Sequence, residues 1–220
     1  MELAVVKCGG AAIARGRFDL GRWIRPGERA VVVHGAGPRI TAALQAAGVE
    51  SCFVGGRRVT TPDAIPVVRE ALRLENAEIC RQVGPRAVPL MGDDLGLEAD
   101  PVDGLGLVGR PRPVAPATLR HLVEANRIPV VAPLAQGPLN VNADDAACAL
   151  AVALGASRLV FVSDVDGVLI GGAPAERLEP QDLEAHRTEL GGGMLPKLEA
   201  ALEAARAGVQ VRVGATRIVV

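Results

Sequence analysis

The chain contains only two lysines, Lys7 and Lys197, among its 24 basic residues, and both lie close to glycines. Lys7 ends an apolar run and precedes Gly9-Gly10, and Lys197 follows the triplet at 191–193. Lysine is a compact charge on a flexible stem and arginine a wide planar fork, so neither replaces the other where a small charge must be placed. Glycines let backbone N–H groups approach an anion closely. The pattern favours two lysines at an anion site over two lysines left on the surface.

A polar segment, Asn140-Val141-Asn142-Ala143-Asp144-Asp145, opens an Ala-rich apolar helix. Asn142 is expected to cap that helix, with Asp145 three residues later as in a capping box. Asp144 would then enter the apolar side of the first turn. A carboxylate in that position needs a cation as partner, and the two lysines are the obvious candidates.

Three further segments carry polar groups near predicted strands. The turn His34-Gly35-Ala36-Gly37-Pro38 joins a strand to a helix start and suits an anion, although an ordinary tight turn has the same pattern; His34 is assigned no chemistry. A buried strand ends at Ser163-Asp164-Val165-Asp166-Gly167, and open α/β sheets bind ligands at the carboxyl ends of strands. A plain Asp-Gly turn would also explain the last two residues. One arginine of Arg57-Arg58 could hold a carboxylate bidentately, though exposed arginines are common in this chain.

Composition excludes several classes of function. The net charge of −1 argues against a general nucleic-acid or membrane-surface binder. Four cysteines without a C-x-x-C pair indicate reduced, mostly buried thiols in a cytoplasmic protein and no metal site. No apolar stretch reaches spanning length, and the first strand begins too early to leave room for a signal peptide. The glycines at 104–109 match a dinucleotide fingerprint, but Arg110-Pro111 cannot continue a helix, so we expect no NAD.

Short apolar runs alternate with helical patterns, which predicts an α/β fold, a three-layer αβα sandwich around a mostly parallel open sheet. Strands are expected at 3–7, 30–34, 51–54, 87–90, 128–132, 158–162 and 210–213. Helices are expected near 38–47, 62–82, 116–126, 143–154, 180–187 and 194–207. Residues 91–115 should form a hairpin over the first lobe. A soft boundary divides one compact domain into lobes at 1–135 and 136–220.

Taken together, these segments resemble the amino acid kinase family. The matching pieces occur in the family's order and run nearly end to end: V-K-C-G-G (6–10), V-H-G-A-G-P (33–38), G-R-R-V-T (56–60), N-V-N-A-D (140–144), S-D-V-D-G-V-L (163–169) and G-G-M-L-P-K (192–197). Within the family they are most similar to members that phosphorylate N-acetyl-L-glutamate.

The resemblance implies transfer of the γ-phosphoryl group of ATP to the side-chain carboxylate of N-acetylglutamate, giving an acyl phosphate in arginine biosynthesis. It makes Lys7, Lys197 and Asp144 the catalytic residues, with Asp144 holding both ammonium groups. Mg²⁺ would be held by the nucleotide phosphates, and no protein metal ligands are expected. The implied substrate-binding residues are Gly35, Ala36, Gly37, Arg58, Asn140 and Asn142. The implied nucleotide-binding residues are Gly9, Gly10, Ser163, Asp164, Val165, Gly167, Leu169, Gly193 and Met194.

The chain departs from the family pattern at three places. Ala36 stands where the family usually has glycine, which would cost roughly 1 kcal/mol if that residue needs a positive φ. The family's helix before the last strand is missing, so part of the nucleotide lobe is trimmed. The N-terminal helix that builds arginine-sensitive hexamers is also missing. We therefore expect a homodimer paired through the helix at 62–82, without arginine feedback.

Two other functions fit the same residues. A sister kinase acts on aminoadipate or glutamate attached to an acidic amino-group carrier protein, and Arg110 and Arg112 would suit such a partner. The pieces N-A-D and R-R-V-T favour the free acetylated amino acid. A non-catalytic, ligand-binding relative is the second alternative, and the intact lysines and Asp144 argue against it.

Overall fold

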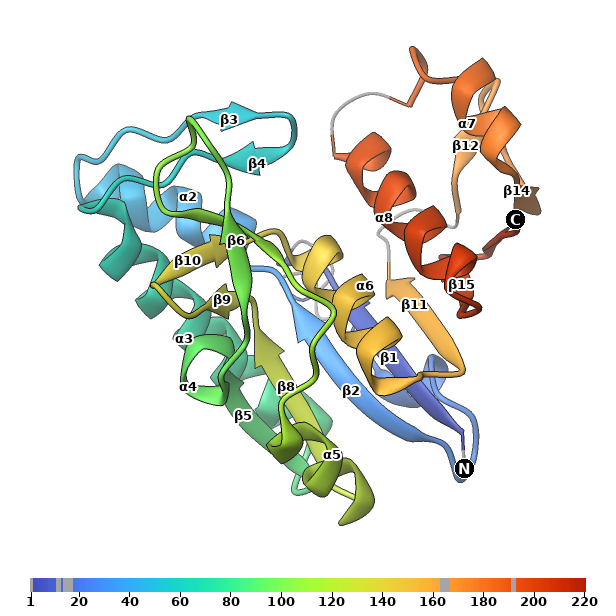
Figure 1. The fold of residues 1–220 in the computed structure, drawn as a ribbon, viewed down its shortest axis with the longest axis horizontal. Helices are drawn as coiled ribbons and strands as arrows, with labels where there is room; N and C mark the ends of the chain where they lie inside the picture. The colour runs from blue at the N-terminus through green and yellow to red at the C-terminus, as the bar shows by residue number, and fades with distance from the viewer. Residues whose placement is uncertain (1, 11–12, 14–17, 163–166, 191–192) are drawn as a thin grey trace.

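The computed structural model describes residues 2–10, 13, 18–162, 167–190 and 193–220. Its centre is an eight-stranded sheet in the order β14-β16-β15-β11-β1-β2-β8-β5 (Figure 1). All neighbouring strands run parallel except β15 and β16, which form an antiparallel hairpin. The strands are β1 (Leu3–Cys8), β2 (Arg29–His34), β5 (Ala87–Met91), β8 (Ile128–Ala132), β11 (Arg158–Val162), β14 (Arg177–Leu178), β15 (Gln210–Val213) and β16 (Thr216–Ile218).

Helices cover both faces of this sheet, as the sequence predicts for a three-layer α/β sandwich. They are α2 (Gly37–Ala46), α3 (Ala64–Val83), α4 (Gly92–Leu95), α5 (Ala117–Glu124), α6 (Ala143–Leu154), α7 (Pro180–Ala185) and α8 (Met194–Arg206), with a 3₁₀ turn, η1, at Leu20–Arg22. None of the helices in the described ranges is long and apolar enough to cross a lipid bilayer.

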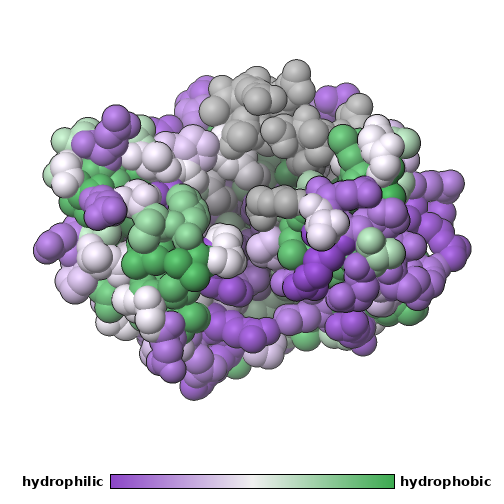
Figure 2. Space-filling view, turned by 90° about the horizontal axis from the view of Figure 1, so that it is seen from above, coloured by the Kyte–Doolittle hydropathy of each residue, from purple (hydrophilic) through white to green (hydrophobic). Residues whose placement is uncertain are grey.

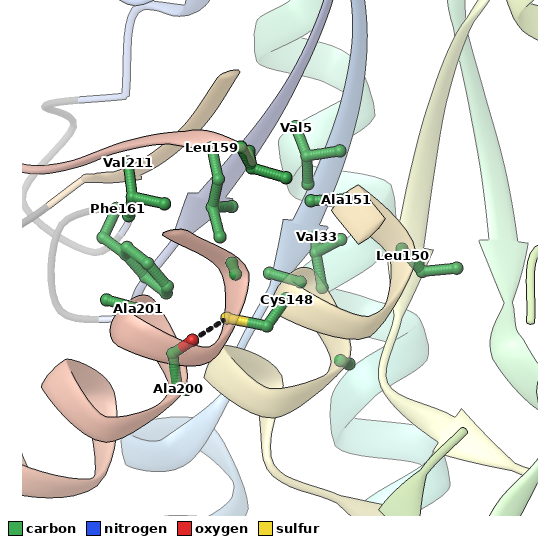
Figure 3. Packing of buried hydrophobic residues seen from close by; sticks show 14 of the residues in the cluster. Val5, Val33, Cys148, Leu150, Ala151, Leu159, Phe161, Ala200, Ala201 and Val211 are labelled. Carbon is green, nitrogen blue, oxygen red and sulfur yellow. Dashed lines mark hydrogen bonds between the residues drawn. The ribbon is translucent and has the colours of Figure 1, made fainter. Parts of the chain in front are cut away.

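Alternate residues of β1 face opposite layers, which explains why all four residues from Leu3 to Val6 are apolar. Val5 packs in the large cluster that contains α6 and α8, whereas Ala4 and Val6 pack in the cluster on the opposite face. Figure 3 shows the first cluster, where Val5, Val33, Leu159 and Phe161 from the strands meet the two helices. In this cluster the Sγ of Cys148 in α6 donates to the carbonyl of Ala200 in α8, with 3.0 Å between them.

Three smaller sheets complete the fold. One has the order β6-β7-β10-β9, from β6 (Ala99–Pro101), β7 (Val108–Pro111), β9 (Leu134–Ala135) and β10 (Leu139–Val141). The second pairs β12 (Leu169–Ile170) with β13 (Ala173–Pro174). The third is a hairpin of β3 (Phe53–Val54) and β4 (Arg57–Arg58), which faces α8 across the top of the molecule in Figure 1.

Two sequence predictions need correction. The strand expected at 51–54 begins at Phe53 and pairs only with β4, because Gly55 and Gly56 turn the chain back with φ of 55° and 75°. The segment 91–115 contains the expected hairpin, as antiparallel β6 and β7, but begins with the short helix α4. The fingerprint-like glycines lie in that hairpin: Gly104 and Gly106 have positive φ, and Gly109 lies in β7.

The cysteines are less uniformly buried than the sequence predicts. Cys8 and Cys148 are buried, Cys80 is half-buried and Cys52 is exposed, and all four are free thiols. Burial raises the pKa of the Cys8 thiol to about 12, although Lys7 beside it acts in the opposite direction. This thiol therefore stays protonated at neutral pH.

A buried ion pair joins β11 to the loop before β2, at the end of the sheet away from the lysines. Arg158 donates from Nε and Nη2 to the two carboxylate oxygens of Glu28, at 2.9 and 2.5 Å. Both residues are buried. Burial alone would raise the pKa of Glu28, but the hydrogen bonds from Arg158 and the backbone hold it below its ordinary value of 4.5.

We predict that Glu28→Gln lowers the free energy of unfolding by about 3 kcal/mol at pH 7, because it leaves the Arg158 charge buried without a counterion. Since the folded-state pKa of Glu28 is lowered, the stabilisation is complete above pH 4.5 and is lost as the pH falls through the folded value. Urea denaturation between pH 7 and pH 3 measures both effects. Glu2→Gln is the matched control, because Glu2 pairs with Arg25 at the surface; it should cost below about 1 kcal/mol.

Candidate active site

Lys7 lies near the carboxyl end of β1 and points toward α6. It is two residues after Val5 and so faces the same layer of helices. The first turn of α6 contains Asp144, whose Oδ1 is 2.7 Å from the Lys7 Nζ. Asn142 caps α6 by accepting from the backbone N–H groups of Asp144 and Asp145, at 2.8 and 3.3 Å. The cap fixes the start of the helix and so places Asp144 over the strand end.

Lys197 reaches the same carboxylate from the first turn of α8. Its Nζ donates to both oxygens of Asp144, at 2.8 and 2.9 Å. The ammonium also lies 5.2 Å from the ring centre of Phe161, which is the β11 residue paired in register with Lys7. A cation over an aromatic face is attracted by the ring. Two lysines separated by 190 positions in the chain therefore converge on one aspartate, as the sequence predicted.

The three charges are strongly coupled because all of them are shielded from water. The side chains of Lys7, Lys197 and Asp144 are 9%, 14% and 12% exposed. Burial alone would raise the pKa of Asp144, but the two ammonium groups outweigh it and hold that pKa below its ordinary value. Burial and the neighbouring Lys7 charge lower the pKa of Lys197, although Asp144 opposes them. For Lys7, burial is outweighed by Asp144, and its pKa is raised. The cluster keeps a net charge of +1 when all three groups are ionised.

A cavity of about 170 Å³ opens beside Lys7 and Asp144. Figure 2 shows, from above, the surface hollowed between the side of the β3–β4 hairpin and the side of α8. All six residues predicted to bind substrate line the cavity, namely Gly35, Ala36, Gly37, Arg58, Asn140 and Asn142. Lys197 is not part of the lining, and contacts Asp144 from the side of α8. Lys7 is therefore in the cavity wall, and Lys197 contacts Asp144 from outside the cavity.

Arg58 also lines the cavity and is buried. Its guanidinium donates to the hydroxyl of Ser51, to the hydroxyl of Thr41 at 2.8 Å and to the carbonyl of Gly37 at 3.3 Å. The guanidinium also stacks over the ring of Phe53, 4.5 Å from its centre. Burial lowers the pKa of Arg58. Within the described part of the chain it forms no ion pair, so an anion in the cavity would be its counterion.

Asn140 and Thr60 form a second fixed polar point in the cavity region. The amide Nδ2 of Asn140 donates to the hydroxyl of Thr60 at 3.0 Å, and that hydroxyl donates to the carbonyl of Arg58 at 3.0 Å. Asn140 is thereby oriented by the strand that carries Arg58. Sequence reasoning missed the orienting role of Thr60 and the contact of Phe53, since neither hydroxyl nor ring is distinctive without knowledge of its neighbours.

The structure decides the conditional expectation for Ala36 and corrects the one for Asp145. Ala36 has φ of −127° and ψ of 29°, so it does not need the positive φ that would have strained an alanine. The capping box is not reciprocal, because the Asp145 carboxylate turns away from the cap and forms an ion pair with Arg57, at 2.6 Å.

The backbone N–H groups of the turn before α2 differ in whether they have a partner. The N–H of Gly35 donates to the carbonyl of Cys8 inside the sheet, at 3.1 Å. The N–H groups of Ala36 and Gly37, at the start of α2, have no partner within the helix.

The described residues expected at the nucleotide follow β1 or lie near the starts of β12 and α8. Gly10 packs so closely that a Cβ there would lie 3.2 Å from the carbonyl oxygen of Gly35. A Cβ on Gly9 would lie 3.9 Å from the Lys7 Nζ, so its backbone borders the ammonium. Gly193 and Met194 start α8, and Leu169 begins β12 with its side chain 47% exposed. Ser163, Asp164 and Val165 lie outside the described residues.

Thr216 ties the short C-terminal hairpin to this region, a contact that sequence reasoning missed. Its hydroxyl accepts from the N–H of Val168 at 2.8 Å and donates to the carbonyl of Ala175 at 2.6 Å. A Cβ on Gly167 would lie 2.7 Å from that hydroxyl, so only glycine fits there. The hairpin of β15 and β16 therefore supports the segment at 167–168.

His34 is not among the residues that line the cavity. His34 is fully buried, and burial lowers its pKa to about 3, so its ring is neutral at physiological pH. Among the described residues, no group of three or more His, Cys, Asp or Glu side chains is arranged to hold a metal ion. Both oxygens of Asp144 are already occupied by ammonium groups.

Comparison with known proteins finds similar sequences over most of the chain. The model of the amino acid kinase family matches residues 2–215. An acetylglutamate kinase of Rubrobacter xylanophilus is 42% identical over 97% of this chain and 88% of its own length. One from a Nocardioides species is 41% identical over 94% of this chain and 75% of its own length.

Solved structures give the same fold. A crystal structure of a Streptococcus mutans UA159 protein is similar with a TM-score of 0.87 and 30% identity, covering 99% of this chain and 98% of that one. A Giardia carbamate kinase has a TM-score of 0.73 at 16% identity, over 99% and 98% of the two chains, which is a likeness of fold alone.

The charge cluster gives a stability prediction. Asp144→Asn leaves two buried ammonium groups without a counterion and should lower the free energy of unfolding by about 3 kcal/mol at pH 7. Lys197→Met leaves a one-to-one pair between Lys7 and Asp144 and removes the repulsion between the lysines, so it should cost less than half as much. Urea denaturation of both variants measures the difference. An Asp144→Asn variant as stable as Lys197→Met would contradict the assigned coupling.

Proposed function

The chain belongs to the amino acid kinase family, and from this premise we propose that it transfers the γ-phosphoryl group of ATP to the side-chain carboxylate of N-acetyl-L-glutamate. One observation carries the proposal: Asp144 holds two lysines beside a cavity whose lining also includes the buried Arg58, which has no ion-pair partner among the described residues. A dicarboxylate has one anionic group for the ammonium groups and one for the guanidinium. The relatives named acetylglutamate kinase support the same substrate.

We assign the lobe at 1–135 to the amino acid and the lobe at 136–220 to the nucleotide. Arg58 would bind the α-carboxylate of the amino acid, which supplies the counterion that the guanidinium lacks among the described residues. The amide oxygen of Asn140 accepts no hydrogen bond from those residues, and it could accept one from the acetamido N–H. The start of α2, at Ala36 and Gly37, would donate to the side-chain carboxylate or the phosphoryl group.

The reaction needs no general base. A glutamate side-chain carboxylate has an ordinary pKa of about 4.3 and is already ionised at neutral pH. One of its oxygens forms a bond to the γ-phosphorus while the bond from that phosphorus to the bridging oxygen of ADP breaks. The products are an acyl phosphate and ADP, and no proton is transferred in the step. Positioning and charge neutralisation then supply most of the catalysis.

The two lysines would act from opposite sides of the migrating phosphoryl group. Lys7 lines the amino-acid cavity and would contact the attacking side. Lys197, on α8, would contact the phosphates from the nucleotide side. Asp144 touches both ammonium groups and acts as their positioning residue, since its bonds fix where the two charges lie.

ATP would occupy the region bordered by Gly9, Gly10, Gly167, Leu169, Gly193 and Met194, with Ser163, Asp164 and Val165 as the further predicted contacts. Mg²⁺ would be held by the nucleotide phosphates, where it would supply charge neutralisation. This fits the described lining of the cavity, because both oxygens of its carboxylate, Asp144, already contact ammonium groups.

The competing substrate, an aminoadipate or glutamate linked to an acidic carrier protein, has the same reacting group. A panel of free N-acetylglutamate, free N-acetylaminoadipate and carrier-linked glutamate, each with ATP and hydroxylamine to trap acyl phosphate, separates the two. We expect the free acetylated glutamate to give the highest kcat/KM. Turnover confined to carrier-linked substrates would overturn the proposed substrate, and no turnover with any of them would favour a non-catalytic relative.

Lys7→Arg should lower kcat by about 100-fold or more while N-acetylglutamate still binds, because the planar guanidinium cannot occupy the place of the compact ammonium beside Asp144. Hydroxylamine trapping measures the rate, and calorimetric titration measures binding. The exposed Arg206→Lys exchanges the same two residue types and should leave both unchanged. Near-normal turnover in Lys7→Arg would contradict the role of a compact charge.

We also propose a homodimer that pairs through α3, next to the open edge strand β5 of the main sheet. Light scattering of the purified protein should give the mass of two chains, and millimolar arginine should leave turnover unchanged. A hexamer, or inhibition by arginine, would contradict this assembly.

A further inference from the structure

The β3–β4 hairpin has a connection to the nucleotide lobe that the proposed mechanism does not use. The Nη2 of Arg57 in β4 donates to Oδ2 of Asp145 in α6 at 2.6 Å. The two side chains are 29% and 15% exposed. They come from segments 88 positions apart, and Figure 1 shows the hairpin and the helices approaching each other from the two halves of the molecule.

A second contact lies beside the ion pair. The turn glycine Gly56 packs against Pro196, so that a Cβ on Gly56 would lie 2.8 Å from the Pro196 Cγ. Pro196 is in the first turn of α8, immediately before Lys197. The tip of the hairpin therefore rests on the helix that carries one lysine, while Arg57 is bonded to the helix that carries the aspartate.

The ion pair joins two residues that are each adjacent in the chain to a residue of the cavity. Arg57 is adjacent to Arg58, whose guanidinium lines the cavity. Asp145 is adjacent to Asp144, which holds both lysines. Arg57 also lines both the inner cavity and a larger outer cleft of about 500 Å³, whose lining includes Asp145. Arg57 thus borders both spaces, and Asp145 borders the larger one.

Among the described residues, the Asp145 carboxylate has Arg57 as its ion-pair partner. The cap of α6 uses the backbone N–H of Asp145 and not this carboxylate. Burial raises the pKa of Asp145, and the charge of Arg57 opposes this rise. Loss of Arg57 would leave a buried carboxyl beside Asp144, so the two partners depend on each other.

We propose that Arg57 and Asp145 are positioning residues that hold the hairpin of Arg58 against the helices of Asp144 and Lys197, so that the amino-acid site and the phosphoryl-transfer groups take up their working geometry together. The inference rests on the proposed function for its kinetic consequences. Its structural content, a hairpin tethered by one ion pair, does not depend on the substrate.

The test uses Arg57→Gln and Asp145→Asn, the double variant of both, and Arg57→Lys. Each neutralising single variant should lower kcat/KM for N-acetylglutamate about 30-fold, with a fall in kcat and little change in the KM for ATP. The double variant should lose little more than either single one, because one interaction is removed in all three. Arg57→Lys should recover most of the rate by restoring the charge. Arg110→Gln is the matched control, since Arg110 lines the same outer cleft but pairs with Glu203 at the surface; it should stay within twofold of the parent.

Hydrogen exchange measured by mass spectrometry gives a readout without turnover. Arg57→Gln and Asp145→Asn should each speed exchange several-fold in the peptide covering 51–60 and leave the peptide covering β1 unchanged. If the parent enzyme forms no acyl phosphate from N-acetylglutamate, the proposed function fails and the exchange data alone decide the tether. Unchanged hairpin exchange in both variants, additive kinetic losses in the double variant, or an equal loss in Arg110→Gln would each overturn the inference.

Discussion

The structure depends on one carboxylate that holds two ammonium groups together in a site shielded from water. Like charges this close repel each other strongly at low dielectric, and Asp144 is the group that makes their proximity stable. Each member of the cluster comes from the end of a different element: Lys7 from the carboxyl end of β1, Asp144 from the first turn of α6 and Lys197 from the first turn of α8. The core beneath them, where β1, β11, α6 and α8 pack together, fixes the relative positions of those ends.

The cluster also gives the site its asymmetry. The pKa of Lys7 is raised and that of Lys197 is lowered, although both bind the same carboxylate. Lys7 borders a small cavity that also contains the buried guanidinium of Arg58, while Lys197 lies outside that cavity with its ammonium over Phe161. An excess of positive charge beside the cavity suits a reaction in which a negatively charged group passes from one substrate to the other.

Most of the fold was predictable because its signals are local. The apolar runs of the parallel strands and the helix starts at Asn142 and Pro180 depend on a few neighbouring residues each. The lysine–aspartate cluster was also predictable, because a scarce residue type and an unexplained carboxylate in an apolar helix each need a partner. The pair of Arg57 and Asp145, the hydroxyl of Thr216 under Gly167 and the ring of Phe161 under Lys197 were not. Each of these contacts depends on which distant segments of the chain pack together, and neither residue spacing nor composition predicts that packing. The sequence left the backbone angle of Ala36 open for a related reason, since the angle required at one position follows from how the whole turn packs.

The most direct measurement of the central claim uses the fact that the chain has only two lysines. Labelling lysine with ¹³C and ¹⁵N gives two side-chain resonances, and a pH titration by NMR yields a pKa for each. Our account predicts two distinct titrations, with Lys197 below the ordinary value of 10.5 and Lys7 above it, and a shift of both resonances when Asp144 is changed to Asn. If both resonances titrate with the ordinary lysine pKa and neither shifts when Asp144 is changed to Asn, the ammonium groups do not converge on this carboxylate.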